Sequence, residues 1–168
     1  MTLTQDTYCS YCGAAFSVGS AWPRTCARCG RTTFRNPLPV AVTLLPVDDG
    51  LLTVRRGIEP GRGQLALPGG FIEMGESWQA AAARELAEET AITIDPPAIR
   101  LFDVHSAPDG TLLIFGLGPV WRAADLPPFQ PTTEAVERVI IAGPATLAFS
   151  LHTAVVQDYF AQRGRLSE

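Results

Sequence analysis

The chain has 168 residues, of which 46% are hydrophobic and 18% are charged, and its formal net charge is −4. This composition excludes a disordered chain, and the length suits one catalytic domain with a single core plus a small attachment. Met1–Ser10 lacks the features of an export signal, and the longest apolar run, around Leu112–Trp121, is too short to span a bilayer. We therefore expect a cytoplasmic protein with no membrane partner.

Positive charge is concentrated near the N-terminus. Residues 1–36 carry four arginines against one aspartate, a net charge of +3, whereas the rest of the chain carries nine arginines against 16 acidic residues, a net charge of −7. Net acidity opposes broad binding to nucleic acid, which depends on neutralising backbone phosphates. We do not expect nucleic acid as a partner of the acidic part, whereas a small phosphorylated substrate held through metal ions remains compatible with it.

Four cysteines form two Cys-x-x-Cys pairs, each followed by glycine: Cys9, Cys12, Cys26 and Cys29. This arrangement is typical of a four-thiolate zinc site, in which two short turns each present two sulfurs to one ion. Two disulfides are the alternative, which a reducing compartment disfavours. We expect residues 1–36 to form a structural zinc ribbon. Binding of RNA or protein by its arginines is a second possibility.

Residues 37–168 are expected to form the second domain, which Asn36–Pro39 joins to the ribbon as an extended segment. Val40–Leu45 and Leu51–Val54 are rich in β-forming residues and flank an Asp-Gly turn signal, which predicts a strand pair. Arg55 and Arg56 follow these strands directly. Either guanidinium is a candidate for bidentate contact with substrate phosphates.

An apolar run ends at Leu67-Pro68-Gly69-Gly70, which predicts a strand that stops in a glycine loop. Ser77 is a suitable N-cap for the helix that follows. On that helix Glu85, Glu88 and Glu89 lie three and four residues apart and therefore project to one side. A solvated acidic face is the alternative, but a hard cation such as Mg²⁺ or Mn²⁺ would hold three such carboxylates and bridge to phosphate oxygens.

These residues carry a resemblance to a known family. The pattern Gly70-x5-Glu76-x7-Arg84-Glu85-Leu86-x-Glu88-Glu89-x-Ala91-Ile92 resembles the signature of the Nudix hydrolases. Ala91 stands where the family usually has glycine. Since alanine is disfavoured in the left-handed conformation at a helix end, we expect the helix to end differently here.

The resemblance implies an α/β fold, the Nudix α/β/α sandwich with a mixed sheet. It also implies metal-dependent attack of water on the diphosphate of a nucleoside diphosphate joined to another group. Glu88 and Glu89 would hold Mg²⁺ or Mn²⁺, and Glu85 would be a further ligand or the base. Glu76 and Arg84 would form a structural ion pair, with Gly69 and Gly70 beside the substrate. Nudix proteins are frequently homodimers.

The remaining elements complete the scaffold. Ile99–Val104 and Thr111–Phe115 flank Asp109-Gly110 and predict a second strand pair, and Val139–Ala142 predicts another short strand. Apolar residues at helical spacing from Leu151 onward predict a C-terminal helix packed on the sheet. His105 is a candidate base, but a loop residue is the simpler interpretation, and His152 is expected to pack or cap.

Glu134 precedes the last expected strand, where Nudix enzymes often place another acidic ligand or base. A surface glutamate is the alternative interpretation, and Glu137 is the second candidate for the same role.

The substrate is less clear from the sequence. A zinc ribbon before this motif resembles the layout of NADH pyrophosphatases, but Leu101–Pro108 lacks the Ser-Gln-Pro-Trp-type element of those enzymes. NAD(H), ADP-ribose and nucleotide sugars all remain candidates. A non-catalytic nucleotide sensor, whose ribbon engages RNA or protein, is the alternative function.

Overall fold

The computed structural model describes residues 6–166, and the side chains among them except those of 164–166. The chain divides into two compact units, Met1–Pro37 and Leu38–Glu168, one residue from the boundary expected at 36. Residues 1–5 of the expected ribbon and 167–168 of the expected second domain lie outside the described part. Among the described helices, none combines the length and the apolar character needed to cross a membrane.

The first unit is built from two similar turns and a small hairpin. In each turn the N–H of the glycine after the second cysteine donates to the carbonyl of the first, Gly13 to Cys9 and Gly30 to Cys26, both at 2.9 Å. Both glycines have φ of 70°, a left-handed conformation that favours glycine. Strands β1 (Arg24–Thr25) and β2 (Thr32–Thr33) pair around the second turn.

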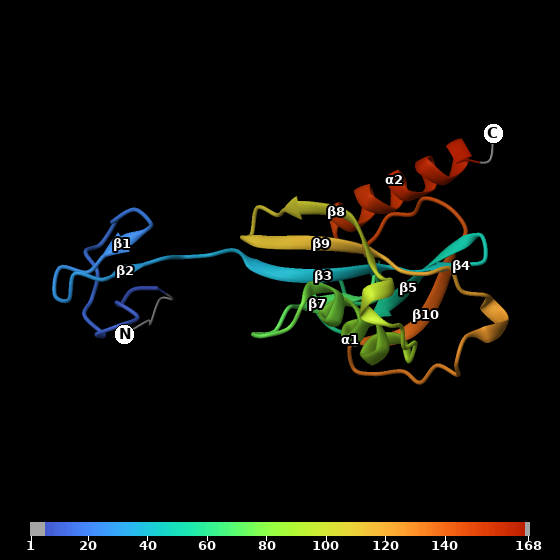
Figure 1. Ribbon diagram of the computed structural model, residues 1–168, viewed down its shortest axis with the longest axis horizontal. Coiled ribbons are helices and arrows are strands. Elements are labelled where there is room, and N and C mark those ends of the chain that lie inside the picture. Colours follow the sequence, from blue (N-terminus) through green and yellow to red (C-terminus); the bar gives the residue numbers. More distant parts are fainter. Residues whose placement is uncertain (1–5, 167–168) are drawn as a thin grey trace. The chain divides into compact units, whose positions relative to one another are not determined.

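The second unit contains two four-stranded sheets and two long helices (Figure 1). One sheet has the order β7-β3-β9-β8 and is mixed, since β3 runs parallel to β9 and antiparallel to β7. The other has the order β10-β5-β4, with β6 also paired to β5. The strands are β3 (Leu38–Leu44), β4 (Pro46–Val47), β5 (Gly50–Arg56), β6 (Leu65–Ala66), β7 (Gly69–Phe71), β8 (Arg100–Ser106), β9 (Thr111–Leu117) and β10 (Ala135–Ile141). The helices are α1 (Trp78–Thr90) and α2 (Ser150–Leu166), with short 3₁₀ turns at Pro96–Ala98 and Ala123–Asp125.

The two expected strand pairs have different outcomes. The pair around Asp109-Gly110 is confirmed, because β8 and β9 are antiparallel. The pairing of Val40–Leu45 with Leu51–Val54 is wrong: β3 and β5 belong to different sheets, and only the short β4 pairs with β5 across the turn. Pro46 has no N–H to donate, so it interrupts the ladder where the chain passes from one sheet to the other.

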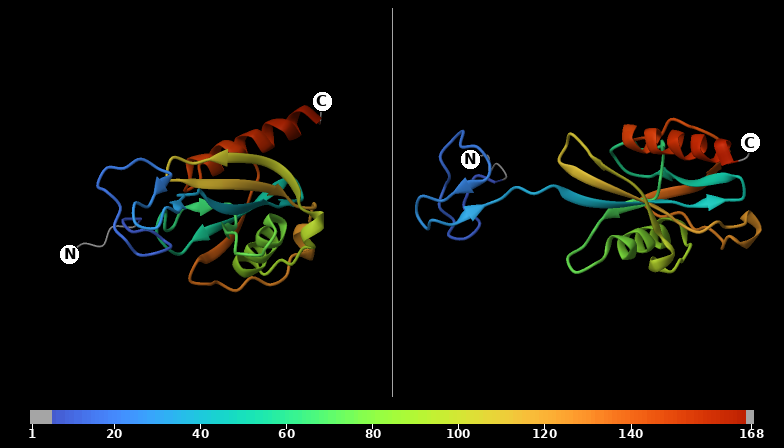
Figure 2. Two further views of the ribbon diagram at one scale, coloured as in Figure 1. Left: turned by 60° about the vertical axis from the view of Figure 1, so that its left-hand side comes forward. Right: turned by 45° about the horizontal axis from the view of Figure 1, so that its top comes forward.

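The helices lie on opposite sides of the strands, which confirms the expected α/β/α layering (Figures 1 and 2). Side chains of β3 alternate between two cores. Ala41 and Leu45, just past the end of β3, pack with the α1 side, whereas Val42 and Leu44 pack with the α2 side. This strand therefore anchors both layers.

Helix α1 begins as the sequence predicts, since the Ser77 hydroxyl accepts from the Ala80 N–H at 3.1 Å. Its end differs from the expectation. Ala91 adopts the left-handed conformation with φ of 62°, and its N–H donates to the Ala87 carbonyl. The helix thus ends as it would with glycine, and alanine carries the strain.

Replacing Ala91 by glycine is expected to stabilise the fold by about 1 kcal/mol, because glycine removes a left-handed strain of about 1–2 kcal/mol at a smaller entropic cost. Urea unfolding measures the change. Ala87→Gly, inside the same helix, should instead destabilise by about 1 kcal/mol. Equal destabilisation by both variants would contradict the strain at Ala91.

Candidate active site

The four cysteines come together in the first unit. Their Sγ atoms all lie within 4.8 Å of one another, with 3.8 Å between Cys9 and Cys29 and 3.7 Å between Cys12 and Cys26. A tetrahedral ion with Zn–S bonds of about 2.3 Å has S–S edges of about 3.8 Å. All four cysteines are free in this structure, and their spacing is that of a single four-thiolate site. A hydrogen bond from the Tyr11 backbone lowers the pKa of Cys9 to about 6, whereas burial and hydrogen bonds to the other three thiols raise the pKa of Cys29 to about 11.

In the second unit, α1 and β7 bring two carboxylates against the glycines. Glu89 is 7% exposed, and its Oε2 accepts from the Gly69 N–H at 3.2 Å. Burial raises the pKa of Glu89 to about 8 and also raises the pKa of Glu85. A Cβ atom at Gly70 would meet the carboxylate of Glu85, so a larger residue there would displace that carboxylate. The expected glycine loop is wrong in one respect, because Gly69 and Gly70 lie in strand β7.

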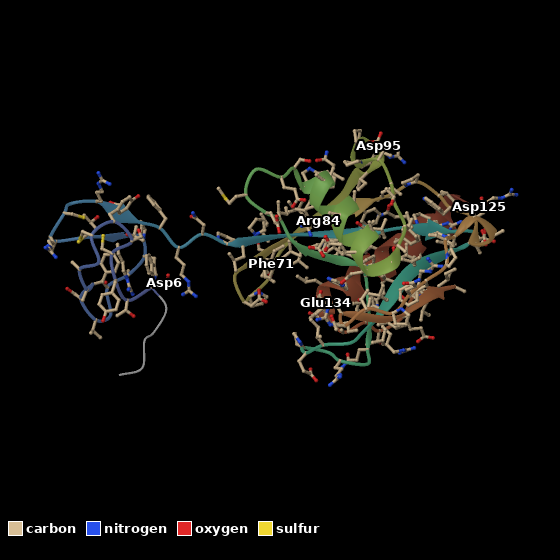
Figure 3. The ribbon with its side chains drawn as sticks, turned by 90° about the horizontal axis from the view of Figure 1, so that it is seen from below. Asp6, Phe71, Arg84, Asp95, Asp125 and Glu134 are labelled. Carbon is tan, nitrogen blue, oxygen red and sulfur yellow. The ribbon has the colours of Figure 1, made fainter. Side chains whose placement is uncertain are left out.

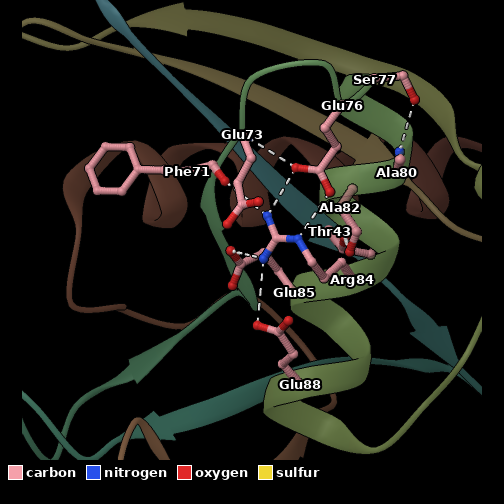
Figure 4. A network of polar contacts seen from close by, with 10 residues as sticks. All are labelled: Thr43, Phe71, Glu73, Glu76, Ser77, Ala80, Ala82, Arg84, Glu85 and Glu88. Carbon is pink, nitrogen blue, oxygen red and sulfur yellow. Dashed lines mark hydrogen bonds and ion pairs between the residues drawn. The ribbon is translucent and has the colours of Figure 1, made fainter.

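Arg84 lies at the centre of the acidic cluster (Figure 4). Its Nε and Nη2 each donate to Glu76 at 3.0 Å, forming the bidentate ion pair, and Nη2 also donates to the Phe71 carbonyl at 3.0 Å. Its Nη1 donates to Glu85 at 2.7 Å and lies 3.5 Å from Glu88. One guanidinium thus offsets part of the repulsion among three glutamates and ties α1 to the segment after β7.

The donor chemistry of α1 suits a hard divalent cation. Glu85, Glu88 and Glu89 offer only carboxylate oxygens, the ligand type that Mg²⁺ and Mn²⁺ prefer. They are less tightly gathered than the cysteines, which are the one group of three or more such side chains within 4.8 Å among the described residues. Glu85 and Glu88 contact Arg84, while Glu89 contacts the Gly69 N–H.

A cavity of about 970 Å³ opens beside these carboxylates. This volume is large enough for a nucleoside diphosphate with a second group, since ligand pockets have volumes of about 300–1,000 Å³. Its acidic lining residues come from α1, from the segment after β7, and from the loops before β9 and β10, the last of which carries Glu134 (labelled in Figure 3). They are Glu73, Glu85, Glu88, Glu89, Asp109 and Glu134. Arg56 is the one arginine among the described lining residues, so the ionised lining would carry a formal charge of −5.

The two candidate arginines face different surroundings. Arg56 lines the cavity, its Nε donates to the Pro60 carbonyl at 2.7 Å, and its guanidinium lies 4.9 Å from the centre of the Phe149 ring. Arg55 instead pairs with Glu137 at 2.6 Å and donates to the Gly63 carbonyl. The geometry therefore separates them, with Arg56 directed to the cavity and Arg55 engaged outside it.

Glu134 and Glu137 are separated in the same way. Glu134 lines the cavity, and its carboxylate contributes to the raised pKa values of Glu85 and Glu89 after burial. Its backbone carbonyl accepts from the Gly57 N–H at 2.7 Å, which fixes the loop beside β5. Glu137 is held by Arg55, so Glu134 is the one of the two glutamates placed to act in the cavity beside the carboxylates of α1.

The histidines differ from the simple expectation. His105 lies in strand β8, where it contacts Asp103 at 2.9 Å, and not in a loop. His152 is buried as expected but also lines the cavity, together with Phe149. Sequence reasoning missed Phe149. The available signal was the spacing of three residues between Phe149 and His152 at the start of an apolar helix, because this spacing places both side chains on one face.

Acidification is expected to destabilise the fold through His152. Burial lowers its pKa from 6.5 to about 4, so the unfolded chain takes up this proton at a higher pH than the folded chain. Stability contributed by the neutral ring is complete above pH 6.5 and falls by about 2–3 kcal/mol as pH drops to about 4. Denaturant unfolding across this range should show a smaller loss for His152→Asn, and equal losses would contradict the assignment.

Residues 37–137 match the NUDIX domain family. NudC of Edwardsiella ictaluri, an NAD-capped RNA hydrolase, is 32% identical over 88 residues, covering 52% of this chain and 34% of that protein. The ADP-ribose pyrophosphatase of Methanocaldococcus jannaschii is 36% identical over 76 residues, covering 45% of this chain and 44% of that protein. The chain thus spans less than half of the length of either relative.

A solved structure matches over nearly the whole chain. The crystal structure of a NUDIX hydrolase from Nitrosomonas europaea superposes with a TM-score of 0.77 at 26% identity, covering 95% of this chain and 93% of that one. The match extends beyond the family domain, so the arrangement of elements is shared along the chain.

Proposed function

The chain belongs to the NUDIX domain family, and from that premise we propose that it hydrolyses the diphosphate linkage of a nucleoside diphosphate joined to another group. NAD(H) and ADP-ribose are the first substrates to consider, because the similar proteins include an NAD-capped RNA hydrolase and an ADP-ribose pyrophosphatase. Nucleotide sugars remain in the same chemical class.

The charge of the cavity is the observation that carries this proposal. Six acidic side chains and one guanidinium line it, and even with Glu89 protonated the five other carboxylates against one guanidinium leave a formal charge of −4. A diphosphate, itself anionic, is therefore repelled unless cations accompany it. Mg²⁺ or Mn²⁺ held by Glu85, Glu88 and Glu89 would neutralise the diphosphate and lower the pKa of an attacking water. A cavity of this charge is difficult to explain as a site for a metal-free anion.

The side chains divide the remaining work. Arg56 is positioned to contact a phosphate oxygen, and Glu134 is the candidate for an acidic ligand or base that accepts a proton from water. Gly69 lets β7 lie close to the β3 backbone and its N–H holds Glu89, while Gly70 leaves room for the Glu85 carboxylate beside the substrate. Arg84 and Glu76 keep α1 and the segment before it in register, a structural role.

We further propose that Cys9, Cys12, Cys26 and Cys29 hold a structural Zn²⁺ in a ribbon that ends near residue 36. The S–S distances support zinc, and the few buried side chains of this unit support a need for it. Residues 37–168 are then the hydrolase domain. Homodimer formation and the absence of a nucleic-acid partner stay predictions.

A substrate panel tests the enzyme proposal. NAD(H), ADP-ribose, nucleotide sugars, coenzyme A, dinucleotide polyphosphates and NAD-capped RNA are incubated with Mg²⁺ or Mn²⁺, and the products are identified by mass. We expect two phosphorylated products from at least one small substrate, and none after EDTA. Metal-dependent binding of a nucleotide without any turnover would instead support the alternative, a non-catalytic nucleotide sensor.

A further inference from the structure

His152 is held in one orientation at the start of α2. It is 5% exposed and packs edge-on against the rings of Phe115 and Phe149, with ring centres 5.6 and 5.0 Å away. Its Nδ1 accepts from the Leu67 N–H at 3.3 Å. Because Nδ1 accepts and the pKa of the ring is lowered to about 4, the neutral tautomer at pH 7 carries its proton on Nε2.

The Nε2–H of His152 has no partner within the described part of the chain. Every fully buried side-chain nitrogen or oxygen in that part does have a partner, so Nε2 must reach a surface. His152 lines the cavity, which is the open space beside its ring. A donor that faces this space is available to a bound molecule, and covering it without an acceptor would have an energetic cost.

The walls near this donor are mostly apolar. Ala148 and Phe149 precede His152 in the chain, and Leu67 contacts it directly, while Ile58 and Pro60 line the cavity from the loop that carries Gly61 against Ala148. Arg56, which lies over the Phe149 ring, is the charged exception. A nucleobase has apolar faces and hydrogen-bonding atoms at its edge, so it matches apolar walls with few donors better than a sugar ring, whose several hydroxyl groups need more partners.

We propose that His152 determines specificity in this cavity: its Nε2–H donates to an acceptor at the edge of a nucleobase that lies against Phe149 and Leu67. The inference rests on the proposed function for the diphosphate, which lies between this end and the carboxylates of α1. Arg56 connects the two ends, because it contacts Phe149 and also acts electrostatically on both His152 and Glu89.

Two substitutions separate this role from a purely structural one. In His152→Asn the side-chain oxygen replaces Nδ1 and keeps the bond to Leu67, but the donor at Nε2 is lost. In His152→Gln the amide nitrogen replaces Nε2, whereas the acceptor for Leu67 is lost. If His152 recognises a base, His152→Asn should weaken nucleotide binding more than His152→Gln does. If His152 has only a structural role, His152→Gln should have the larger effect.

Calorimetry with Mg²⁺ measures the binding of AMP, UMP and the base-free control ribose 5-phosphate. For His152→Asn we expect about tenfold weaker binding of a nucleotide that the wild type prefers, with ribose 5-phosphate unchanged. For His152→Gln we expect nucleotide affinity close to that of the wild type, although its melting temperature falls. Wild-type affinity in His152→Asn, or no preference of the wild type for nucleotides, would overturn the inference.

A second measurement needs no variant. If the wild type prefers AMP, its 1-deaza, 3-deaza and 7-deaza analogues each remove one ring acceptor, and one of them should bind about tenfold more weakly. Equal binding of all three would reject an adenine contact with His152. Turnover tests the proposed function separately. Hydrolysis without a preference for any base would contradict only the role of His152. Base-dependent binding without hydrolysis would contradict only the proposed enzymatic activity.

Discussion

Glu89→Gln is expected to lower turnover by at least about 100-fold while leaving the fold as stable as before or more so. Residues that hydrogen-bond to metal ligands typically contribute about 10- to 100-fold to metal affinity or activity, and a ligand itself should contribute no less. Glutamine can still accept from the Gly69 N–H, and it removes a buried carboxylate whose pKa is raised to about 8. In the metal-free protein the folded state binds this proton more tightly than the unfolded state, so stability without metal falls as pH rises through about 4.5 to 8.

The measurements are kcat with Mg²⁺ or Mn²⁺, affinity for Mn²⁺, and melting temperature at pH 7 and 8. Glu88→Gln should lower turnover in the same way, but with little effect on stability, because Glu88 is exposed. Asp95→Asn removes an exposed carboxylate outside the cavity and serves as the matched control (Figure 3). Unchanged turnover in both glutamate variants would refute the role assigned to α1.

Cys26→Ser is expected to unfold the first unit. Structural zinc supplies about 10–16 kcal/mol of folding free energy in comparable small domains, and three thiolates with one hydroxyl hold the ion far less tightly. Cys26 is 2% exposed, and its carbonyl also accepts from Gly30 in the second turn. We expect loss of bound zinc and collapse of the ribbon amide signals to unfolded positions, while signals of the second unit stay dispersed.

Ser10→Ala is the control for the same turn, since it removes only an exposed hydrogen bond to Thr33 at 3.2 Å. It should retain zinc and all dispersed signals. Retention of a folded ribbon in Cys26→Ser would show that the metal is not what stabilises it. Loss of a binding partner without loss of stability would favour an interaction role for the ribbon.

Local spacing was sufficient for the parts of the molecule that one element determines. The Cys-x-x-Cys-Gly turns predict the sulfur cluster, and Ser77 predicts the start of α1, because each depends on neighbours within a few residues. Glu85, Glu88 and Glu89 were likewise placed on one side of a helix by its period alone.

Features that depend on distant contacts were not predicted in the same way. Nothing within the dipeptide Arg55-Arg56 indicates which guanidinium faces the cavity; alternation along β5 and the ion pair with Glu137 on β10 decide it. The glycines of β7 favour a loop when read locally, but in the structure Gly69 lies against the β3 backbone and Gly70 lies beside the Glu85 carboxylate. The sequence does not show that the Leu67 N–H donates to Nδ1 of His152, the contact that leaves Nε2 as the donor.

The alternation of β3 has a consequence for how the domain opens. Since Ala41 faces one core and Val42 the other, neither helical layer can detach without exposing apolar surface on this shared strand. The two layers are therefore expected to unfold as one cooperative unit, with the slowest hydrogen exchange at the amides of β3. Substitutions under α2 would then change the stability of the acidic helix α1 through this shared strand, although α2 and α1 lie on opposite faces of it.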